Sequence, residues 1–377
     1  MRRFYLPLLS LLLLANCGQP NENPTLTSVS SYQVIAYVHG LEDNWGVDFA
    51  KANQITHINF AFANIVNGKV TEGSPNDAEV IRKLHALKRV NPNLKILVSV
   101  GGWTWSTHFS DVALTADSRE VFAQSAVDFL KKHRLDGIDL DWEYPGLPGI
   151  GNPHRPEDKE NFTALLKLIR EKLDAYGVNA NHYLLTIATA ASQAYLDHTD
   201  LAVAHQYLDF INIMTYDYHG AWTPKTGHHS NLVVSKYDDN PTLVSSTIAT
   251  QQHIAAGIPI EKLVLGVPFY GRWWTGVNPL NNGLYQSAAT GKGGGFDYKI
   301  IADSLLQRED FTYYWDTLAQ APYLWRAADS TFVTYENPSS LRAKIDFVKE
   351  AGMGGLMFWE FNGDNGELLD TIEEHLR

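Results

Sequence analysis

Cysteine is nearly absent from the chain: its 377 residues contain a single one, Cys17. A lone cysteine excludes any disulfide within the chain. None of the histidines stands in a metal-binding spacing such as HExxH, and we interpret His228, His229 and His253 as surface or core residues. No GxGxxG or P-loop pattern occurs either, which argues against a dinucleotide-binding fold. We therefore expect no metal ion and no cofactor.

Positive charge is also scarce. The chain carries 30 Lys and Arg residues against 42 Asp and Glu residues, a net charge of −12. An acidic surface argues against nucleic acid and anionic membranes as partners, whereas a neutral ligand needs no electrostatic steering. The hydrophobic content of 45% and the charged content of 19% fit a globular protein with a sizeable core, for which we expect a monomer.

The N-terminal apolar run, residues 4–15, is too short to span a bilayer. It follows Arg2 and Arg3, so residues 1–17 are predicted to be a signal peptide. The sequence Leu-Ala-Asn-Cys at 14–17 resembles a bacterial lipobox, in which the cysteine is lipidated; Gly18 favours the outer membrane. Polar residues 18–31 are predicted to form a tether. We expect an exported protein whose only membrane contact is a lipid on Cys17, at the cell surface or outer membrane; a plain secretory signal is the alternative.

The segment 135–145 concentrates acidic residues in an otherwise apolar stretch. Asp136, Asp139, Asp141 and Glu143 give four carboxylates within eight residues. Side chains of a strand alternate between two faces, so the last three acids share one face and Ile138, Leu140 and Trp142 share the other. Carboxylates side by side are costly to bury unless they share protons or hydrogen bonds. Such a row is typical of a catalytic site.

Two other interpretations of this segment are possible: a calcium-binding loop and a solvated edge strand. A calcium-binding EF-hand loop needs glycine at its sixth position and glutamate at its twelfth. Counted from Asp139, those positions hold Tyr144 and Ile150, which excludes it. A solvated edge strand is a second alternative, but Trp142 between the acids argues against it.

Strand-like and helix-like segments alternate along the chain. Eight strands are predicted, in order, at 34–37, 55–62, 95–99, the acidic segment, 183–188, 210–216, 262–268 and 355–359. This alternation predicts a parallel (β/α)₈ barrel over residues 32–377. The interval 273–337 is too long for a structureless loop and contains glycine-rich turns and aromatic, strand-like pieces, so we predict a small α+β subdomain inserted there after the seventh strand.

Barrels of this kind carry their catalytic residues at the carboxyl ends of the strands. Aromatic and hydrogen-bonding residues gather at the predicted ends: Tyr37, Phe62, Ser99, Trp103, Glu143, Tyr144, Met214, Tyr216, Asp217, Tyr270, Arg272 and Trp359. Core packing would explain any one of the aromatic residues. Their recurrence at one rim favours a carbohydrate groove.

Four motifs in the right order resemble glycoside hydrolase family 18, the chitinases and their relatives. Residues 136–143 are similar to its DxxDxDxE signature, 99–102 to SxGG, 214–217 to MxYD and 354–360 to its last strand. The interval 273–337, with Trp315-Asp316 and residues 321–324, resembles the insertion of bacterial-type chitinases. The resemblance covers about residues 32–377.

This resemblance implies a retaining mechanism in which the substrate's own acetamido group is the nucleophile. Glu143 would be the general acid and then the base. Asp141 would orient the acetamido group, Tyr216 would donate to its carbonyl oxygen, and Asp217 would contact the same sugar. Asp139 would share a proton with Asp141, because adjacent buried carboxylates resist joint ionisation.

The resemblance also implies binding roles. Trp359 would lie beneath the distorted sugar, with a cis peptide bond to Glu360. Trp103 and Trp222 would stack on the leaving-group side, and Arg272 and Asp316 would hydrogen-bond sugars. We expect a chitinase acting on chitin or N-acetylglucosamine oligosaccharides. A hydrolase of peptidoglycan or of the N-glycan core, and a non-catalytic chitin-binding lectin, are the alternatives.

Overall fold

A computed structural model describes residues 32–39, 49–177, 182–240, 242–289 and 291–377. The predicted signal peptide and tether, with Cys17, lie outside the described residues. In the part of the chain that is described, no helix is both long and apolar enough to cross a membrane.

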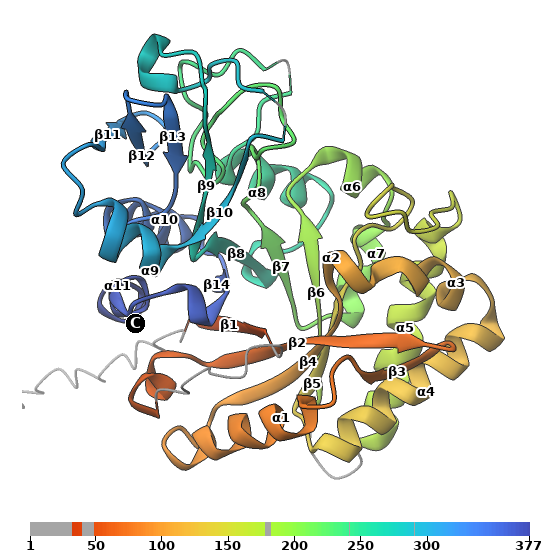
Figure 1. The fold of residues 1–377 in the computed structure, drawn as a ribbon. Helices are drawn as coiled ribbons and strands as arrows, with labels where there is room; N and C mark the ends of the chain where they lie inside the picture. Colours follow the sequence, from red (N-terminus) through yellow and green to blue (C-terminus); the bar gives the residue numbers. More distant parts are fainter. Residues whose placement is uncertain (1–31, 40–48, 178–181, 241, 290) are drawn as a thin grey trace, which may run out of the picture. The chain divides into compact units, whose positions relative to one another are not determined.

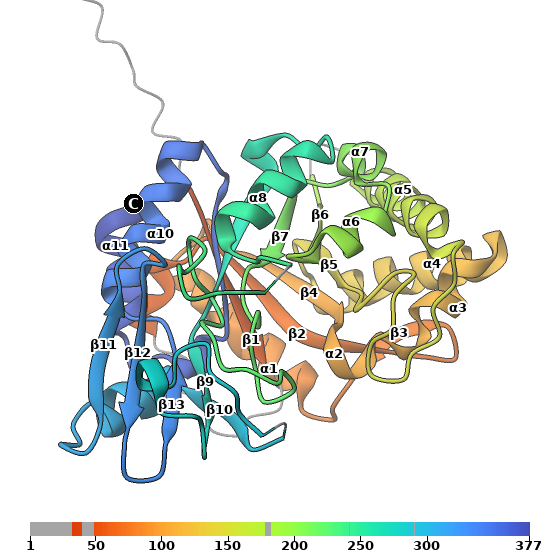
Figure 2. The same cartoon turned by 90° about the horizontal axis from the view of Figure 1, so that it is seen from above.

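Eight parallel strands close into a barrel (Figures 1 and 2). They are β1 (Gln33–His39), β2 (His57–Val66), β4 (Lys95–Gly101), β5 (Gly137–Asp141), β6 (Leu184–Ala190), β7 (Phe210–Met214), β8 (Leu263–Pro268) and β14 (Gly355–Trp359). Neighbours pair in the order β1-β14-β8-β7-β6-β5-β4-β2, and the β1–β2 pairing closes the ring. The predicted (β/α)₈ barrel is confirmed. An additional strand, β3 (Lys69–Glu72), pairs antiparallel with β2 and was not predicted.

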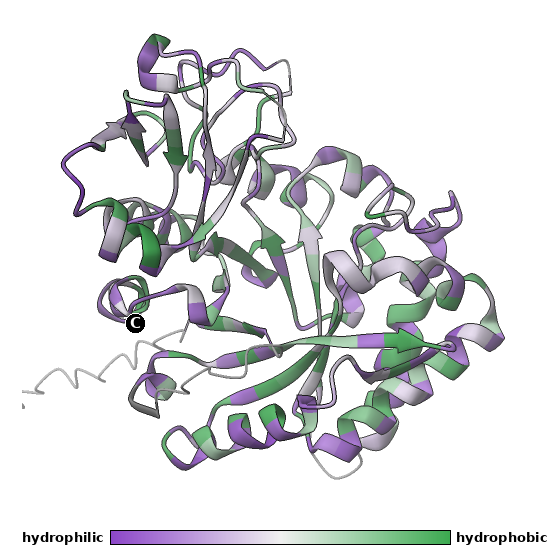
Figure 3. Ribbon diagram, viewed as in Figure 1, coloured by the Kyte–Doolittle hydropathy of each residue, from purple (hydrophilic) through white to green (hydrophobic). Residues whose placement is uncertain are grey.

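Helices surround the barrel. The longer ones are α1 (Asp77–Ala86), α4 (Ala116–His133), α5 (Asp158–Tyr176), α8 (Ser246–Ala255), α10 (Pro338–Ala351) and α11 (Glu367–Leu376). The shorter ones are α2 (Gly102–Trp105), α3 (Phe109–Leu114), α6 (Gln193–Asp197), α7 (Leu201–Ala204) and α9 (Tyr298–Ile300). Side-chain caps begin several of them: Thr115 caps α4 and Asn337 caps α10, each in a reciprocal capping box. Hydrophobic and hydrophilic residues alternate along α1 and α4 (Figure 3), as expected for helices with one buried side.

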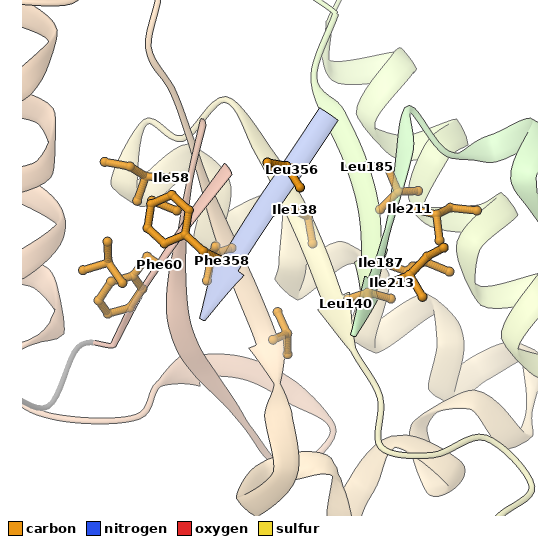
Figure 4. Close-up of a cluster of buried hydrophobic side chains, with 14 of the residues drawn as sticks. Ile58, Phe60, Ile138, Leu140, Leu185, Ile187, Ile211, Ile213, Leu356 and Phe358 are labelled. Carbon is orange, nitrogen blue, oxygen red and sulfur yellow. The ribbon is translucent and has the colours of Figure 1, made fainter. Parts of the chain in front are cut away.

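The main core lies between the barrel strands and the surrounding helices. Strand residues of alternating position point into it. Figure 4 labels some of them, from β2, β5, β6, β7 and β14: Ile58, Phe60, Ile138, Leu140, Leu185, Ile187, Ile211, Ile213, Leu356 and Phe358. The residues between them face the barrel interior. The alternation predicted for the acidic strand is therefore correct, but both of its faces are buried.

A second sheet of five antiparallel strands occupies the interval between β8 and α10. Its order is β10-β9-β13-β12-β11, with β9 (Tyr270–Trp274), β10 (Gly293–Asp297), β11 (Thr312–Asp316), β12 (Ala321–Arg326) and β13 (Thr331–Thr334). One face of the sheet carries its own small core, which includes Trp274, Tyr323 and Phe332.

Several boundaries differ from the predicted ones. Strand β9 starts at Tyr270, so the second sheet begins before the predicted boundary at residue 273. Strand β5 ends at Asp141 and β7 ends at Met214, so Glu143 and the segment 215–217 lie beyond the strands. Among the described residues, the backbone of Glu143 and of residues 215–217 makes no strand-to-strand hydrogen bonds, so it can turn at these positions and direct the side chains towards the mouth of the barrel.

Candidate active site

A cavity of about 1320 Å³ opens at the carboxyl ends of the barrel strands. Most of the predicted site residues line it: Phe62, Trp103, Asp141, Glu143, Tyr144, Met214, Tyr216, Asp217, Trp222, Tyr270, Arg272 and Trp359. Residues that were not predicted also line it, among them His39, Trp105, Ala190, Phe296 and Asp297. The second sheet contributes to the wall through β10, whose residues 295–297 belong to the lining.

Asp139 forms the base of the acidic row and is fully buried beneath the cavity. Three hydroxyls donate to its carboxylate: Tyr37 at 2.9 Å, Ser99 Oγ at 2.7 Å and Thr186 Oγ1 at 2.5 Å. Burial raises the pKa of Asp139, and these hydrogen bonds act in the opposite direction. Tyr37 and Ser99 were predicted to bind sugar. The structure places both side chains behind the cavity, where they are buried and donate to Asp139.

Asp141 lies between Asp139 and the cavity. Its Oδ1 atom is buried and has no protein hydrogen-bond partner among the described residues. Burial, followed by the neighbouring charges of Glu143 and Asp139, raises its pKa well above the ordinary value. Burial therefore disfavours the charged form of this carboxyl group, which has one oxygen free for a ligand.

Glu143 follows the end of β5 and has an exposed fraction of only 8%. Burial raises the pKa of Glu143 to about 7, with a further increase from the charge of Asp217, whereas a hydrogen bond with Tyr144 acts against them. The peptide bond between Glu143 and Tyr144 is cis. A carboxyl group with a pKa near neutrality can both give and take a proton, as general acid and base catalysis requires.

Asp217, beyond the end of β7, is held in a different way. Arg272 donates two hydrogen bonds to its carboxylate, from Nε at 2.7 Å and Nη2 at 2.6 Å. The ring of His229 lies 3.8 Å from the same carboxylate. Burial alone would raise the pKa of Asp217, but His229 and Arg272 lower it to about 2. The Asp217 backbone is left-handed, with φ of 61°. This carboxylate is a permanent negative charge.

Aromatic rings form much of the remaining cavity surface. Trp359 stacks on Phe62 with ring centres 5.4 Å apart, and both follow or precede cis peptide bonds, at 359–360 as predicted and at 61–62. The guanidinium of Arg272 lies 5.0 Å from the ring of Trp222 and 4.9 Å from that of Tyr270. Trp103 and Trp222 expose 47% and 55% of their surface. Exposed indole rings beside a cavity are suited to stacking on apolar sugar faces.

Asp316, at the end of β11, does not line the cavity. Its carboxylate is buried and accepts hydrogen bonds from the Ser235 hydroxyl and from the backbone amides of Leu318 and Ala319. Asp316 was predicted to bind sugar; in the structure this side chain anchors the loop that follows β7 to the second sheet.

The described residues contain no group of three or more histidine, cysteine or acidic side chains arranged to hold a metal ion. His228, His229 and His253 are all fully buried.

Thr186 and Ser106 are functional neighbours that the sequence reasoning missed. Strand register could have found Thr186, because Asp139 is the partner of Ser99 in β4 and of Thr186 in β6. Ser106 follows α2, and its hydroxyl contacts the backbone of the acidic segment. No periodic pattern in the sequence indicates that Ser106 would lie beside the acidic segment.

The chain is similar to known proteins in sequence and in fold. The family described as glycosyl hydrolases family 18 matches residues 33–364. The chain is 40% identical to chitinase A1 of Niallia circulans over 92% of its own length, but it covers only 58% of that protein. It is 33% identical to chitinase 1 of Aphanocladium album, over 88% of this chain and 84% of that one.

Two solved structures are similar throughout. A family 18 N-acetylglucosaminidase from Paenibacillus barengoltzii has a TM-score of 0.85 and 39% identity, over 92% of this chain and 100% of that one. A group IV chitinase from Ostrinia furnacalis has a TM-score of 0.83 and 32% identity, over 92% and 99%. The family match covers the whole described barrel together with the acidic row, and the chain belongs to glycosyl hydrolases family 18.

Proposed function

We propose that the protein is a chitinase that hydrolyses β-1,4 bonds between N-acetylglucosamine units with retention of configuration. The observation that carries this proposal is the pairing of Glu143, whose pKa is about 7, with Asp141, which lines the same cavity and whose buried Oδ1 has no hydrogen-bond partner among the described residues. Several relatives with this fold are named chitinases.

In the first step, Glu143 gives its proton to the glycosidic oxygen as the bond to the anomeric carbon breaks. The acetamido carbonyl oxygen of the same sugar attacks that carbon, which gives an oxazolinium ion. Asp141 accepts a hydrogen bond from the acetamido N–H, and the Tyr216 hydroxyl donates to the carbonyl oxygen. Glu143, now a carboxylate, then takes a proton from the water that opens the ion.

The surrounding groups are suited to this sequence of steps. Asp217 and Arg272 form a fixed ion pair beside the reacting sugar, and Trp359 offers an aromatic surface below it. The substrate supplies the nucleophile, so Asp141 is required only to orient and to stabilise charge.

The test is a timed product profile. The full chain is incubated with the N-acetylglucosamine hexamer and the anomers are resolved. We expect early release of the β-anomeric dimer, and loss of all release in Glu143→Gln. Binding of the hexamer without cleavage by the wild-type protein would point to a lectin, and failure of both would direct the search to peptidoglycan or the N-glycan core.

A second activity has one observation in its favour. The Paenibacillus protein that this chain covers completely is described as an N-acetylglucosaminidase. Early release of monomer rather than dimer in the same profile would favour that activity over a dimer-releasing chitinase.

We further propose export and lipidation at Cys17, on the basis of the lipobox-like sequence alone. Radioactive palmitate is expected to label the wild-type protein but not Cys17→Ser. Labelling that persists in the variant would contradict the proposal.

A further inference from the structure

We propose that Ser106 is a positioning residue that fixes the backbone on both sides of the acid pair, a role that rests on the proposed function of Glu143 and Asp141. Ser106 begins a short 3₁₀ turn (Ser106–His108) directly after α2 and is 1% exposed. It does not line the cavity, so it acts through the acids and not on substrate.

The Ser106 hydroxyl has contacts on both sides of Trp142. Its Oγ accepts a hydrogen bond from the backbone N–H of Glu143 at 2.9 Å. It lies 3.0 Å from the carbonyl oxygen of Asp141 and 2.9 Å from that of Gly102, to either of which it can donate its single proton. One hydroxyl thus bridges the two backbone groups that flank the acid pair.

These backbone groups lie where the sheet stops supporting them. The pairing of β5 with β6 ends at Leu140, and its pairing with β4 ends at Asp141. Beyond that point Glu143 has no strand neighbour, and its buried N–H needs another acceptor. Ser106 supplies the acceptor that a neighbouring strand would otherwise supply.

The turn after β4 brings Ser106 to this place. Gly101 and Gly102 both have positive φ angles, of 106° and 72°. A Cβ on Gly101 would lie 2.4 Å from the carbonyl oxygen of Asp141. The chain therefore needs glycine at Gly101 for Ser106 to approach the acidic segment closely.

Trp142 explains why the hydroxyl controls side-chain position. Its ring is buried in the outer core, stacked on Phe109 with centres 5.3 Å apart and edge-on to Phe162. The side chain at this position is therefore fixed on the outer face. Ser106 holds the backbone on both sides of Trp142. The distance between the carboxyl groups of Asp141 and Glu143, and the direction in which they point, are therefore fixed.

Ser106→Ala is the test, with the hexamer as substrate and the full chain as enzyme. We expect kcat to fall about 10- to 100-fold, as for a small misplacement of reacting groups, with KM changed less than about threefold. We also expect the basic limb of the pH profile of kcat/KM to move to lower pH, because a loosened segment admits water to Glu143. The titratable groups around Glu143 (Asp141, Tyr144, Tyr195, Tyr216 and Asp217) are the same in every variant.

Ser110→Ala is the matched control. Ser110 is also a fully buried serine, four residues along the chain on α3, and it donates to Asp158 at 2.6 Å and accepts from Arg155 at 2.6 Å. Its removal also deletes a buried hydroxyl but leaves the backbone of the acid pair untouched. We expect its pH profile to match that of the wild type.

Ser106→Thr keeps the hydroxyl and is expected to recover most of kcat. If Ser106→Thr does not fold, the pH profile of kcat/KM of Ser106→Ala still tests the positioning role. If Ser106→Ala has an unshifted basic limb and a kcat near that of Ser110→Ala, the positioning role is overturned. Absence of cleavage by the wild type would instead overturn the proposed function.

Discussion

Glu143 and Asp217 are carboxylates that line one cavity, and their environments differ in kind. The pKa of Glu143 is raised to about 7, whereas that of Asp217 is lowered to about 2. Both groups experience burial, which acts against the charged form. The difference comes from the ring of His229 and the guanidinium of Arg272, which together lower the pKa of Asp217 and have no counterpart at Glu143 among the described residues. These two neighbours decide which acid can exchange a proton near neutral pH and which remains charged.

The groups that hold the backbone near the two carboxylates also differ in charge. Neutral hydroxyls from Tyr37, Ser99, Thr186 and Ser106 hold the acidic segment at the end of β5. Hydroxyls can hold a carboxyl group without fixing its charge, because they donate and accept.

A buried ion pair lies behind the end of β7. Lys344 on α10 pairs with Glu336 and also donates to Ser230 Oγ at 2.6 Å, and Ser230 donates to the backbone of Thr215, next to Tyr216. Charged partners therefore support this side of the site. The contrast separates a proton-exchanging side from a permanently charged side.

The largest expected effect comes from Glu143→Gln, which removes the exchangeable proton and keeps the shape. We expect kcat to fall by about 10²- to 10⁴-fold, the usual contribution of a general acid. Hexamer binding is expected to persist, measured by calorimetry. Wild-type turnover by this variant would show that the proton comes from elsewhere.

Lys344→Met tests the charged support. Removing one partner leaves Glu336 as an uncompensated buried charge, so we expect a loss of about 3–5 kcal/mol in the free energy of unfolding. Denaturant titration measures it, and Lys344→Met/Glu336→Leu is the control that removes both charges. The double variant is expected to recover part of the loss. Equal stability of Lys344→Met and wild type would mean that the ion pair contributes nothing.

The contributions of Glu143 and Asp217 to the free energy of unfolding are expected to change in opposite directions with pH. The folded-state pKa of Glu143 lies above its unfolded value of about 4.3, so its protonation stabilises the fold at low pH and this contribution is lost as pH rises through about 7. The folded-state pKa of Asp217 lies below its unfolded value, so its contribution is present above about pH 4 and is lost as pH falls towards about 2.

Unfolding of Glu143→Gln at several pH values measures this difference. Its stability relative to the wild type is expected to rise by about 1–3 kcal/mol between pH 4 and pH 8, since one pKa unit corresponds to about 1.4 kcal/mol. A relative stability that does not change with pH would contradict the raised pKa.

The acidic row could be predicted from the sequence, because period-two alternation places Asp139, Asp141 and Glu143 on the same side of the chain. The eight-strand barrel followed from the same patterning. Side-chain direction beyond a strand end could not be predicted. Asp316 closes a loop through Ser235, a partner far away in the sequence, and this depends on how the second sheet meets the barrel.

The depth of a side chain along the barrel axis could not be predicted from the sequence either. Tyr37 and Ser99 were placed at strand ends, but β1 continues to His39 and β4 to Gly101. Both side chains therefore lie below the rim and contact Asp139, not the cavity. A residue pattern gives the face of a strand, whereas the depth depends on the length and stagger of its neighbours.

Arg272→Lys is expected to have the smallest effect, because it keeps the charge beside Asp217. It loses the bidentate hydrogen bonds and the flat contact with Trp222 and Tyr270. We expect KM for the hexamer to rise about three- to tenfold, corresponding to about 1 kcal/mol, with kcat nearly unchanged.

Arg326→Lys is the matched control for this change. Arg326 also makes a bidentate contact, with Asp329 at 2.8 and 2.7 Å, and lies against the ring of Phe311, but it does not line the cavity. Its replacement is expected to leave KM unaltered. If Arg272→Lys instead lowers kcat and spares KM, Asp217 acts in the transition state, and the separation between a proton-exchanging side and a merely charged side is too simple.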